Sequence, residues 1–288
     1  MLFLSKNRNG FTLIVFAFVL QGCFTFTKTP RQLKKYFAEK QVPFQRVLSN
    51  FGHRKLHYVK TGDAKKTTIV FVHGSPGSYS AFLDFLSDST LRQHFQLVSV
   101  DRPGFGYANY GWAEPSIDLQ ADIITEIIQS FSGKVILVGH SLGGPVIANL
   151  AMRYPQHVRG IILVAASVDP KLEPNERWFR GPLRTPFLKW ILPVSMRVSN
   201  EEIYDLRTEL EYMLPQWKNI VCPVAIVHGE RDQLVPYQNV DFIQQQLNEA
   251  APKFLFTKKE MNHFVPWTNP ELIHQAIFKM EEVTKPTN

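Results

Sequence analysis

Residues 135–144, with the sequence VILVGHSLGG, join an apolar run directly to a glycine-rich turn that has a serine at its centre. The run Val135–Val138 predicts a strand that is buried on both faces, as the strands of parallel sheets are. The residues Leu142–Tyr154 that follow it predict a helix. A strand that passes into a helix through so short a turn is typical of an α/β sheet protein, and it places Ser141 at the sharp junction between the two elements.

The same alternation runs along most of the 288 residues, a length that suits one large α/β domain or two small ones. Strands are predicted at 44–49, 53–60, 67–72, 96–100, 135–138, 160–164, 224–227 and 253–257, the first two joined by a turn at 50–52. Helices are predicted at 79–93, 117–130, 142–154, 237–249 and 270–283. The alternation favours a mostly parallel eight-stranded sheet with helices on both faces. Polar, glycine-rich segments follow five of the strands, and ligands bind beyond the carboxyl ends of strands in such sheets.

The alternation stops between Asp169 and Asn219, in a stretch rich in proline and aromatic residues. Ser199 and Glu202 have the spacing of a capping box, which predicts a helix that starts at Ser199. The apolar stripe of that helix comprises Ile203, Leu206, Leu210 and Met213. We therefore expect a helical cap insertion at about 170–219, placed over the strand ends.

The cap insertion is also basic in its first part. The cations are Lys171, Arg177, Arg180, Arg184 and Lys189. They are compatible with a solvated face, with anionic lipid headgroups or with an acidic substrate.

The N-terminal segment resembles the signal peptide of bacterial lipoproteins. Two cations precede the apolar stretch Phe11–Leu20, which is too short to span a bilayer comfortably. The segment LQGC at 20–23 is similar to a lipobox, so residues 1–22 are expected to be removed and Cys23 to be lipidated. Since no aspartate follows Cys23, the resemblance favours the outer membrane of the cell envelope. A secretory peptide with a coincidental cysteine and an uncleaved signal anchor remain alternatives. Residues 23–43 are expected to form a tether and a short helix, and 284–288 a tail.

Composition narrows the possible partners. The formal net charge of +7 permits contact with an anionic membrane, but no basic cluster is interleaved with aromatic residues, so nucleic acid is not expected. The chain has two cysteines. With Cys23 lipidated, Cys222 has no partner for a disulfide and is expected to be a small buried apolar residue. Neither a metal nor an organic cofactor is expected.

The segment Gly139–Gly143 matches the nucleophile elbow G-x-S-x-G, in which a serine stands exposed on a tight turn between a strand and a helix. At this point the chain resembles the α/β-hydrolase superfamily over about residues 44–283. The other segments that carry the resemblance are HGSPG at 73–77, DRPGFG at 101–106, GERD at 229–232 and NHF at 262–264. All five occur in order, each at a predicted strand end.

The resemblance implies a triad of Ser141 as nucleophile, His263 as base and Asp232 as acid. It also implies an oxyanion hole made by the backbone N–H groups of Ser75 and Leu142. Asp169, after the preceding strand, remains an alternative acid, in which case Asp232 would only cap a helix.

Other polar residues near the turns have structural interpretations. His73 and His140 are expected to hold the loops by hydrogen bonds, and Asp101 is expected to fix its own turn. His57 is expected at a surface or core position.

The implied activity is that of a serine hydrolase of the esterase or lipase type, which cleaves carboxylic esters or thioesters through an acyl-enzyme intermediate. An acyl substrate of lipid-like or other small-molecule kind is the expected partner. Two alternatives stay open: a carbon–carbon-bond hydrolase that uses the same triad, and a non-catalytic envelope protein that uses the fold for binding.

Overall fold

The computed structural model describes residues 26–247 and 251–285. The predicted signal peptide at 1–22 and Cys23 lie outside these residues. Within the two described ranges, no helix combines the length and the apolar character that a membrane span requires.

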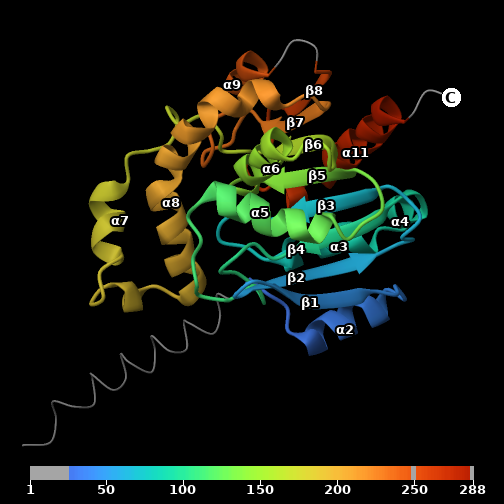
Figure 1. Ribbon diagram of the computed structural model, residues 1–288, viewed down its shortest axis with the longest axis horizontal. Helices are drawn as coiled ribbons and strands as arrows, with labels where there is room; N and C mark the ends of the chain where they lie inside the picture. The colour runs from blue at the N-terminus through green and yellow to red at the C-terminus, as the bar shows by residue number, and fades with distance from the viewer. Residues whose placement is uncertain (1–25, 248–250, 286–288) are drawn as a thin grey trace, which may run out of the picture.

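An eight-stranded sheet forms the centre of the molecule (Figure 1). Its strands, in spatial order, are β1 (Gln45–Phe51), β2 (Arg54–Thr61), β4 (Gln96–Val100), β3 (Thr68–Val72), β5 (Val135–His140), β6 (Val158–Val164), β7 (Val224–Gly229) and β8 (Lys253–Lys258). The strands from β4 to β8 in this order pair in parallel, whereas β2 is antiparallel to both β1 and β4. The predicted fold, a mostly parallel eight-stranded α/β sheet, is confirmed.

The hairpin between β1 and β2 turns later than the sequence predicts. A turn was expected at 50–52, but Phe51 still pairs with Arg54, so the turn consists of Gly52 and His53. Gly52 has a φ of +55°, a conformation that glycine adopts without a steric penalty. The glycine, rather than the asparagine before it, therefore decides where this hairpin turns.

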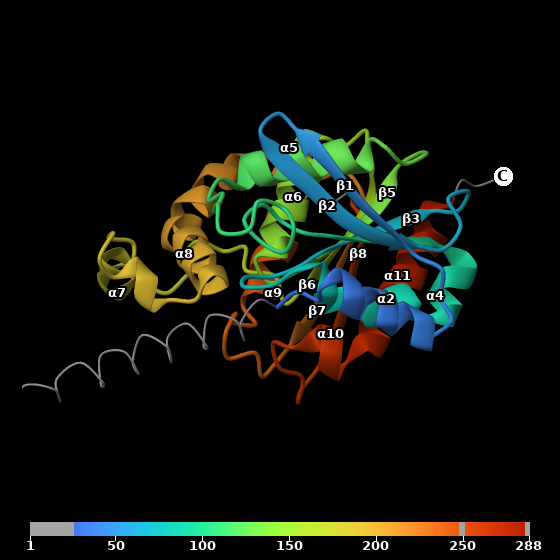
Figure 2. The ribbon, with the colours of Figure 1, turned by 90° about the horizontal axis from the view of Figure 1, so that it is seen from below.

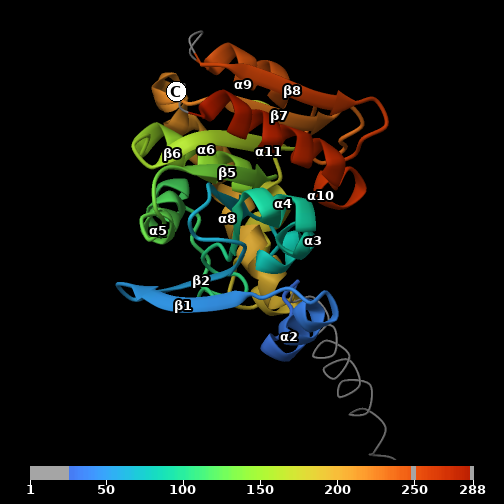
Figure 3. The same cartoon turned by 90° about the vertical axis from the view of Figure 1, so that its right-hand side faces the viewer.

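Helices cover both faces of the sheet. One face packs against α5 (Ile117–Ile128), α6 (Gly143–Arg153) and α9 (Asn239–Gln246). The other packs against α2 (Pro30–Glu39), α3 (Leu83–Ser87), α4 (Ser89–His94) and α11 (Pro270–Thr284). Figure 2 shows α5 and α6 opposite α2 and α11, and Figure 3 shows α5 opposite α3 and α4.

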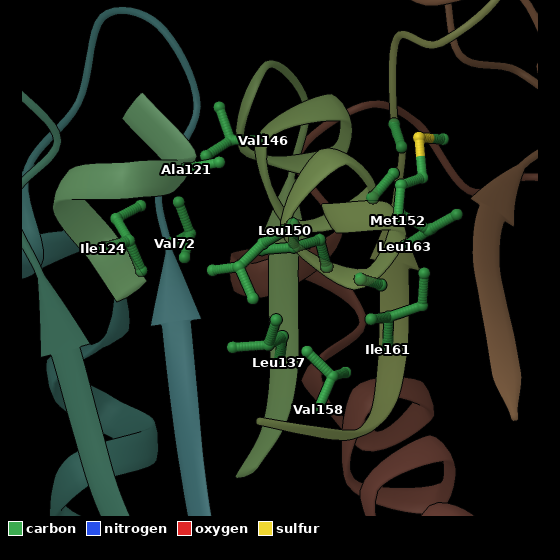
Figure 4. Packing of buried hydrophobic residues seen from close by; sticks show 14 of the residues in the cluster. Val72, Ala121, Ile124, Leu137, Val146, Leu150, Met152, Val158, Ile161 and Leu163 are labelled. Carbon is green, nitrogen blue, oxygen red and sulfur yellow. The ribbon is translucent and has the colours of Figure 1, made fainter. Parts of the chain in front are cut away.

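The two faces form separate apolar clusters because successive strand residues point in opposite directions. In β3, Val70 and Val72 belong to the first cluster, whereas Ile69 and Phe71 belong to the second. Figure 4 shows part of the first cluster, in which Leu150 of α6 lies near Leu137 of β5.

The single helix predicted at 79–93 is interrupted in the structure. A 3₁₀ turn, η1 (Tyr79–Phe82), leads into α3, and α4 begins separately after Asp88. Asp88 has extended backbone angles, and its side chain accepts a hydrogen bond of 2.8 Å from the Leu91 N–H. An aspartate with this geometry is a helix N-cap, and it starts a new helix in place of continuing the old one.

The cap consists of α7 (Arg177–Leu183), η2 (Lys189–Ile191), α8 (Val194–Met213) and η3 (Leu214–Asn219). Figure 1 shows α7 and α8 to the left of the strands, beyond their ends, with α7 outermost. The prediction that the helix starts at Ser199 is wrong, because α8 starts at Val194 and its N-cap residue is Pro193. Ser199 lies buried inside the helix, and Glu202 therefore completes no capping box.

The described chain begins against the loop that follows β3. The Ser78 hydroxyl donates to the Phe26 carbonyl at 2.5 Å, and the Tyr79 hydroxyl donates to the Lys28 carbonyl at 2.8 Å. Helix α2 follows directly, with Thr29 as its N-cap in a capping box. The start of the described chain thus lies beside the carboxyl end of β3.

Candidate active site

Ser141 occupies the turn between β5 and α6 in a strained conformation. Its φ of +52° lies in the left-handed region, which costs a non-glycine residue about 1–3 kcal/mol. Backbone hydrogen bonds hold the turn: the Ser141 N–H donates to the Val164 carbonyl at 2.9 Å, and the Gly144 N–H donates to the Ser141 carbonyl at 2.8 Å. The fold therefore maintains a conformation that the residue itself disfavours, as is common at functional sites.

The glycines around Ser141 allow three close backbone approaches. A Cβ atom on Gly143 would lie 2.4 Å from the Val72 carbonyl oxygen, and one on Gly139 would lie 2.4 Å from the Gly143 carbonyl oxygen. A Cβ atom on Gly144 would lie 2.3 Å from the Cβ of Ala166. Side chains at these positions would push α6 away from β3 and β6, so the glycines permit the sharp turn that exposes the serine.

Asp232 and His263 meet although they come from separate loops. Asp232 follows β7, His263 follows β8, and the His263 Nδ1–H donates to Asp232 Oδ2 at 2.8 Å. The other carboxylate oxygen accepts the N–H groups of Leu234 at 2.9 Å and Val235 at 2.8 Å. The carboxylate is thus fixed by its own loop and directed at the imidazole.

Gly229 brings these two loops together. A Cβ atom at this position would lie 2.0 Å from the Met261 carbonyl oxygen. The Arg231 N–H donates to that same carbonyl at 3.1 Å. A side chain at residue 229 would separate the loop of the aspartate from the loop of the histidine.

The environment of Asp232 favours its ionised form. Burial alone would raise the pKa of this carboxyl, but hydrogen bonds from His228 and His263 outweigh burial and hold the pKa below its ordinary value. His228 Nε2 lies 3.5 Å from Asp232 Oδ2 and 3.1 Å from the Val235 carbonyl oxygen. An ionised carboxylate against Nδ1 keeps the proton on that nitrogen and leaves Nε2 of His263 free to accept one.

Asp169, the alternative acid, lies in a different environment. Its carboxylate accepts the Lys171 N–H at 2.9 Å, and its own N–H donates to the Asn239 side chain at 2.9 Å. The structure therefore pairs His263 with Asp232 and uses Asp169 to shape the loop after β6.

Ser141 and His263 line one cavity of about 430 Å³, which lies between the strand ends and the cap. The Ser141 hydroxyl makes no hydrogen bond to any residue in the described part of the chain. Ser141 and His263 therefore line the same cavity without a hydrogen bond between them. Bonds between catalytic groups are often long before substrate binds. The apolar residues of the cavity wall are Leu142, Phe179, Leu183, Leu192, Met196, Ile203, Leu206, Leu234 and Val235.

Ser75 and Leu142 line the same cavity. Among the described residues, neither backbone N–H has a hydrogen-bond acceptor. Gly74 packs directly on Ser141, since a Cβ atom on Gly74 would lie 2.9 Å from the Ser141 Cβ. Both N–H groups belong to residues on the cavity wall that Ser141 also lines, and backbone N–H groups without an acceptor are the kind of donor that an oxyanion hole uses.

Two buried histidines hold the surrounding loops, as expected. His140 Nε2–H donates to the His263 carbonyl at 3.0 Å, and His73 Nδ1–H donates to the Gly74 carbonyl at 2.7 Å. Burial and then the neighbouring His263 lower the pKa of His140 to about 3, and burial and then Arg102 lower the pKa of His73 well below its ordinary value. Both rings are therefore neutral at physiological pH.

Glu202 is the important residue that the sequence did not reveal. This carboxylate of α8 is 1% exposed and pairs with the fully buried guanidinium of Arg102, at 2.7 and 3.1 Å. It also accepts the Ser75 hydroxyl at 2.7 Å and the Gln120 side-chain N–H at 3.1 Å. Arg102 in turn donates to the carbonyls of His73 at 2.8 Å and Gly74 at 3.0 Å. One buried ion pair thus connects the cap helix to the loop that presents the Ser75 amide.

A second buried histidine–aspartate pair lies away from the cavity. His57 Nδ1–H donates to Asp101 at 2.7 Å, and Asp101 also accepts the N–H groups of Tyr79 and Tyr107, each at 2.8 Å. As expected, Asp101 fixes its own turn. His57 belongs to the core.

Cys222 is buried, and burial raises the pKa of its thiol to about 12. A thiol in this state is a poor nucleophile, as expected for a residue that only fills space. Residues 26–247 and 251–285 contain no group of three or more His, Cys, Asp or Glu side chains that could hold a metal ion.

Comparison with known proteins places the chain in a family. Residues 69–276 match the family described as the Alpha/beta hydrolase family. The chain belongs to this family. Both the predicted fold and the predicted class, a hydrolase enzyme, are therefore confirmed. The matched residues include Ser141, Asp232 and His263, together with the whole cap.

Individual relatives are more distant. The chain is 32% identical over 131 residues to a 1-acylglycerol-3-phosphate O-acyltransferase of Arabidopsis thaliana, a match that covers 41% of this chain and 30% of the relative. It is 32% identical over 124 residues to a pimeloyl-[acyl-carrier protein] methyl ester esterase of Shewanella woodyi, which covers 43% and 44% of the two chains. The chain thus spans less than half the length of either curated relative.

Among solved structures, the fold is similar to that of a membrane phospholipase A described as a bacterial virulence factor. The TM-score is 0.68 at 16% identity, and the match covers 98% of this chain and 100% of that chain. At this identity the likeness concerns the fold.

Proposed function

We propose that this protein hydrolyses carboxylic esters through Ser141, His263 and Asp232. The observation that carries the proposal is the hydrogen bond of 2.8 Å from His263 to a carboxylate whose environment keeps it ionised, on the wall of the cavity that also contains Ser141. The strained elbow around Ser141 supports the same role, since it presents the hydroxyl at the end of a helix where negative charge is favoured.

The reaction follows from these positions. His263 Nε2 takes the hydroxyl proton of Ser141 while the oxygen attacks the carbonyl carbon of the ester, which gives a tetrahedral intermediate. The intermediate collapses when the imidazolium returns the proton to the leaving alcohol, and an acyl-serine remains. A water molecule, deprotonated by the same imidazole, then attacks the acyl-serine, and the imidazolium returns that proton to the Ser141 oxygen as the acid leaves. Asp232 holds the ring in the required tautomer and stabilises the imidazolium throughout.

The free amides of Ser75 and Leu142 are assigned to the oxyanion. Losing one such donor typically costs about 10²–10³-fold in turnover. Glu202 and Arg102 contribute indirectly, because they fix the loop that carries Ser75.

The shape and lining of the cavity favour a substrate with an apolar acyl group. Its volume of about 430 Å³ and its leucine-rich wall suit a hydrocarbon chain, and Ser141 and His263 line the same cavity. Esters or thioesters of lipid-like acids are therefore the proposed substrate class. The names of the two curated relatives also refer to acyl groups.

We further propose that the protein is held at the bacterial cell envelope, preferably the outer membrane, by a lipid on Cys23. The lipobox-like segment supports this proposal. Mass spectrometry of the N-terminal peptide from membrane fractions tests it: an acylated Cys23 is expected, and an unmodified peptide that begins elsewhere would contradict it.

The hydrolysis is tested with nitrophenyl esters of increasing acyl length and a fluorophosphonate probe. The wild type should be labelled and should prefer longer acyl chains over acetate. Ser141→Ala and His263→Ala should lose turnover by a factor on the order of 10⁴ to 10⁶ while their circular dichroism spectra stay unchanged. Ser167→Ala, which alters another serine of the cavity wall, should still be labelled.

Three outcomes would reject the proposal. Labelling that persists in Ser141→Ala would mean that another group reacts. A wild type that neither turns over any ester nor reacts with the probe would favour the non-catalytic alternative. Cleavage of a diketone panel in preference to every ester would favour the carbon–carbon-bond hydrolase.

A further inference from the structure

The outer part of the cap exposes large apolar side chains. Trp178 is 78% exposed, Phe187 91%, Trp190 60% and Ile191 69%. We call these four residues the cap patch. They lie within one short segment, in α7, in η2 and in the connection between them, which Figures 1 and 2 show as the part of the described chain farthest from α11. Single exposed apolar residues are ordinary, but such a group indicates a surface that contacts something apolar.

Cations accompany the cap patch. Arg177 of α7 and Lys189 of η2 have no carboxylate within 4.0 Å among the described residues, whereas Arg180 and Arg184 are paired with acids of the cap. The Lys189 ammonium and the Arg197 guanidinium lie 5.5 and 4.6 Å from the ring centre of Trp190. The segment therefore combines exposed aromatic rings with unneutralised positive charge.

The cap patch is the outer side of the cavity wall. Phe179 and Leu183 line the cavity from α7, and Leu192 lines it next to η2. Their neighbours in sequence, Trp178 and Ile191, point to solvent instead. The segment of α7 and η2 thus presents side chains to the cavity and to solvent.

We propose that the cap patch docks on a lipid bilayer that contains anionic lipids. Tryptophan rings are favoured at the boundary between headgroups and acyl chains, where an apolar body and a polar N–H are both accommodated. The unpaired cations add attraction to anionic headgroups, and such attraction weakens as salt is added. A protein partner would also bury apolar rings, but these cations would then have to meet acids of that partner. The docking goes beyond the proposed hydrolysis and does not require it.

Vesicle flotation tests the docking with the full chain carrying Cys23→Ser, so that lipid modification plays no part. The protein should float with vesicles of phosphatidylcholine and phosphatidylglycerol, and less with phosphatidylcholine alone or at high salt. The triple variant Trp178→Ser/Phe187→Ser/Trp190→Ser should bind at least about tenfold more weakly. The matched control Tyr212→Ser/Val221→Ser removes two side chains of similar exposure, 70% and 65%, outside the cap patch and should bind like the parent.

Fluorescence quenching by brominated acyl chains places the rings directly. Tryptophan emission of the parent should be quenched by brominated vesicles, and Trp178→Phe/Trp190→Phe, which preserves apolar character, should lose most of that quenching. Equal quenching of the two proteins would overturn the proposal. Equal flotation of the parent and the triple variant would also overturn it. If the triple variant changed from dimer to monomer and still bound vesicles as the parent does, the cap patch would instead contact a second copy of the chain.

Hydrolysis of a short soluble ester separates this proposal from the one above. The triple variant should retain the parent's rate on that ester while its rate on esters embedded in vesicles falls. A parent that binds vesicles but hydrolyses no ester would reject the proposed function and leave the docking supported.

Discussion

At the scale of single residues, the orientation of His263 depends on one carboxylate oxygen. Asp232 Oδ2 accepts the imidazole N–H, while Oδ1 is occupied by two backbone N–H groups. An asparagine at this position would keep the size of the side chain, but it would replace one acceptor oxygen with an NH₂ donor. If its NH₂ group faced the ring, His263 would have to carry its proton on the nitrogen that should face Ser141.

We therefore expect Asp232→Asn to lower kcat for esters by ~10⁴-fold, because the wrong imidazole tautomer cannot accept the serine proton. The change in thermal stability should be much smaller than this loss. Steady-state kinetics and a melting curve of the same preparation measure both. Asp169→Asn is the matched control, and its kcat should stay within about tenfold of the wild-type value. If Asp169→Asn lowered kcat more than Asp232→Asn, Asp169 would be the acid instead.

The residues of the candidate site differ in how well the sequence reveals them. Ser141, Asp232 and His263 follow strands whose apolar runs are unambiguous, and each lies in a short motif. Glu202 was misinterpreted because Ser199 and Glu202 have the spacing of a helix start. Its true partner, Arg102, is 100 residues away in the chain, and no local pattern joins the two.

At the scale of elements, α8 and the loop after β3 behave as one unit. Glu202 of α8 accepts the Ser75 hydroxyl and the Arg102 guanidinium, and Arg102 holds the carbonyls of the same loop. Movement of α8 away from the sheet would leave a guanidinium buried without its carboxylate, which is strongly unfavourable. The structure thus favours a cap whose base stays fixed during turnover.

We expect Glu202→Gln to destabilise the protein by up to about 3–5 kcal/mol, because Arg102 loses the charge that compensates its burial. In the fraction that stays folded, kcat should fall more than KM rises, since a displaced Ser75 amide weakens transition-state binding. Urea unfolding and kinetics on short and long esters measure the two effects.

Ser199→Ala tests whether α8 starts at Val194 or at Ser199. If Ser199 were a helix cap, its loss would cost about 1 kcal/mol. Because Ser199 lies inside α8, a smaller effect is expected. A loss in Ser199→Ala as large as in Glu202→Gln would contradict the arrangement of the cap described above.

The positions of strands could be predicted from the sequence where burial of apolar residues alone determines them. The parallel strands β3 to β7 are buried on both faces almost throughout, and their positions were predicted to within about two residues. Boundaries that depend on a single residue were missed. Asp88 starts a new helix by capping it, Gly52 shifts the hairpin, and α8 starts after Pro193, earlier than the polar pattern indicates.

For the whole molecule, the two buried neutral histidines couple folding to pH. His73 and His140 have pKa values lowered by burial, to about 3 for His140, whereas an unfolded histidine takes up a proton below about pH 6.5. The unfolded state therefore binds more protons than the folded state as pH falls from about 6.5 towards 3. The contribution of the two neutral histidines to the free energy of unfolding is therefore complete above about pH 6.5, and it is lost as the pH falls below that value.

The free energy of unfolding should accordingly fall by up to ~1.4 kcal/mol per pH unit for each of the two histidines below pH ~6.5. His140→Gln, which retains an N–H donor, should reduce this slope by about one proton. Denaturant titrations between about pH 7 and 4.5 give the slope above the range in which most carboxylates titrate. An unchanged slope in His140→Gln would show that this ring is already charged in the native protein.

The point at which the described chain joins the folded body has a geometric consequence. Phe26 is fixed to Ser78 beside the carboxyl end of β3, at the same end of the parallel strands as Ser141. An extended chain advances at most about 3.6 Å per residue, so an acylated Cys23 could stand no more than ~11 Å from Phe26. A lipid at that position would confine the protein to orientations in which this rim stays within roughly a nanometre of the membrane surface. The anchored enzyme would then diffuse in two dimensions, and an ester embedded in the same membrane would meet it by diffusion along that surface.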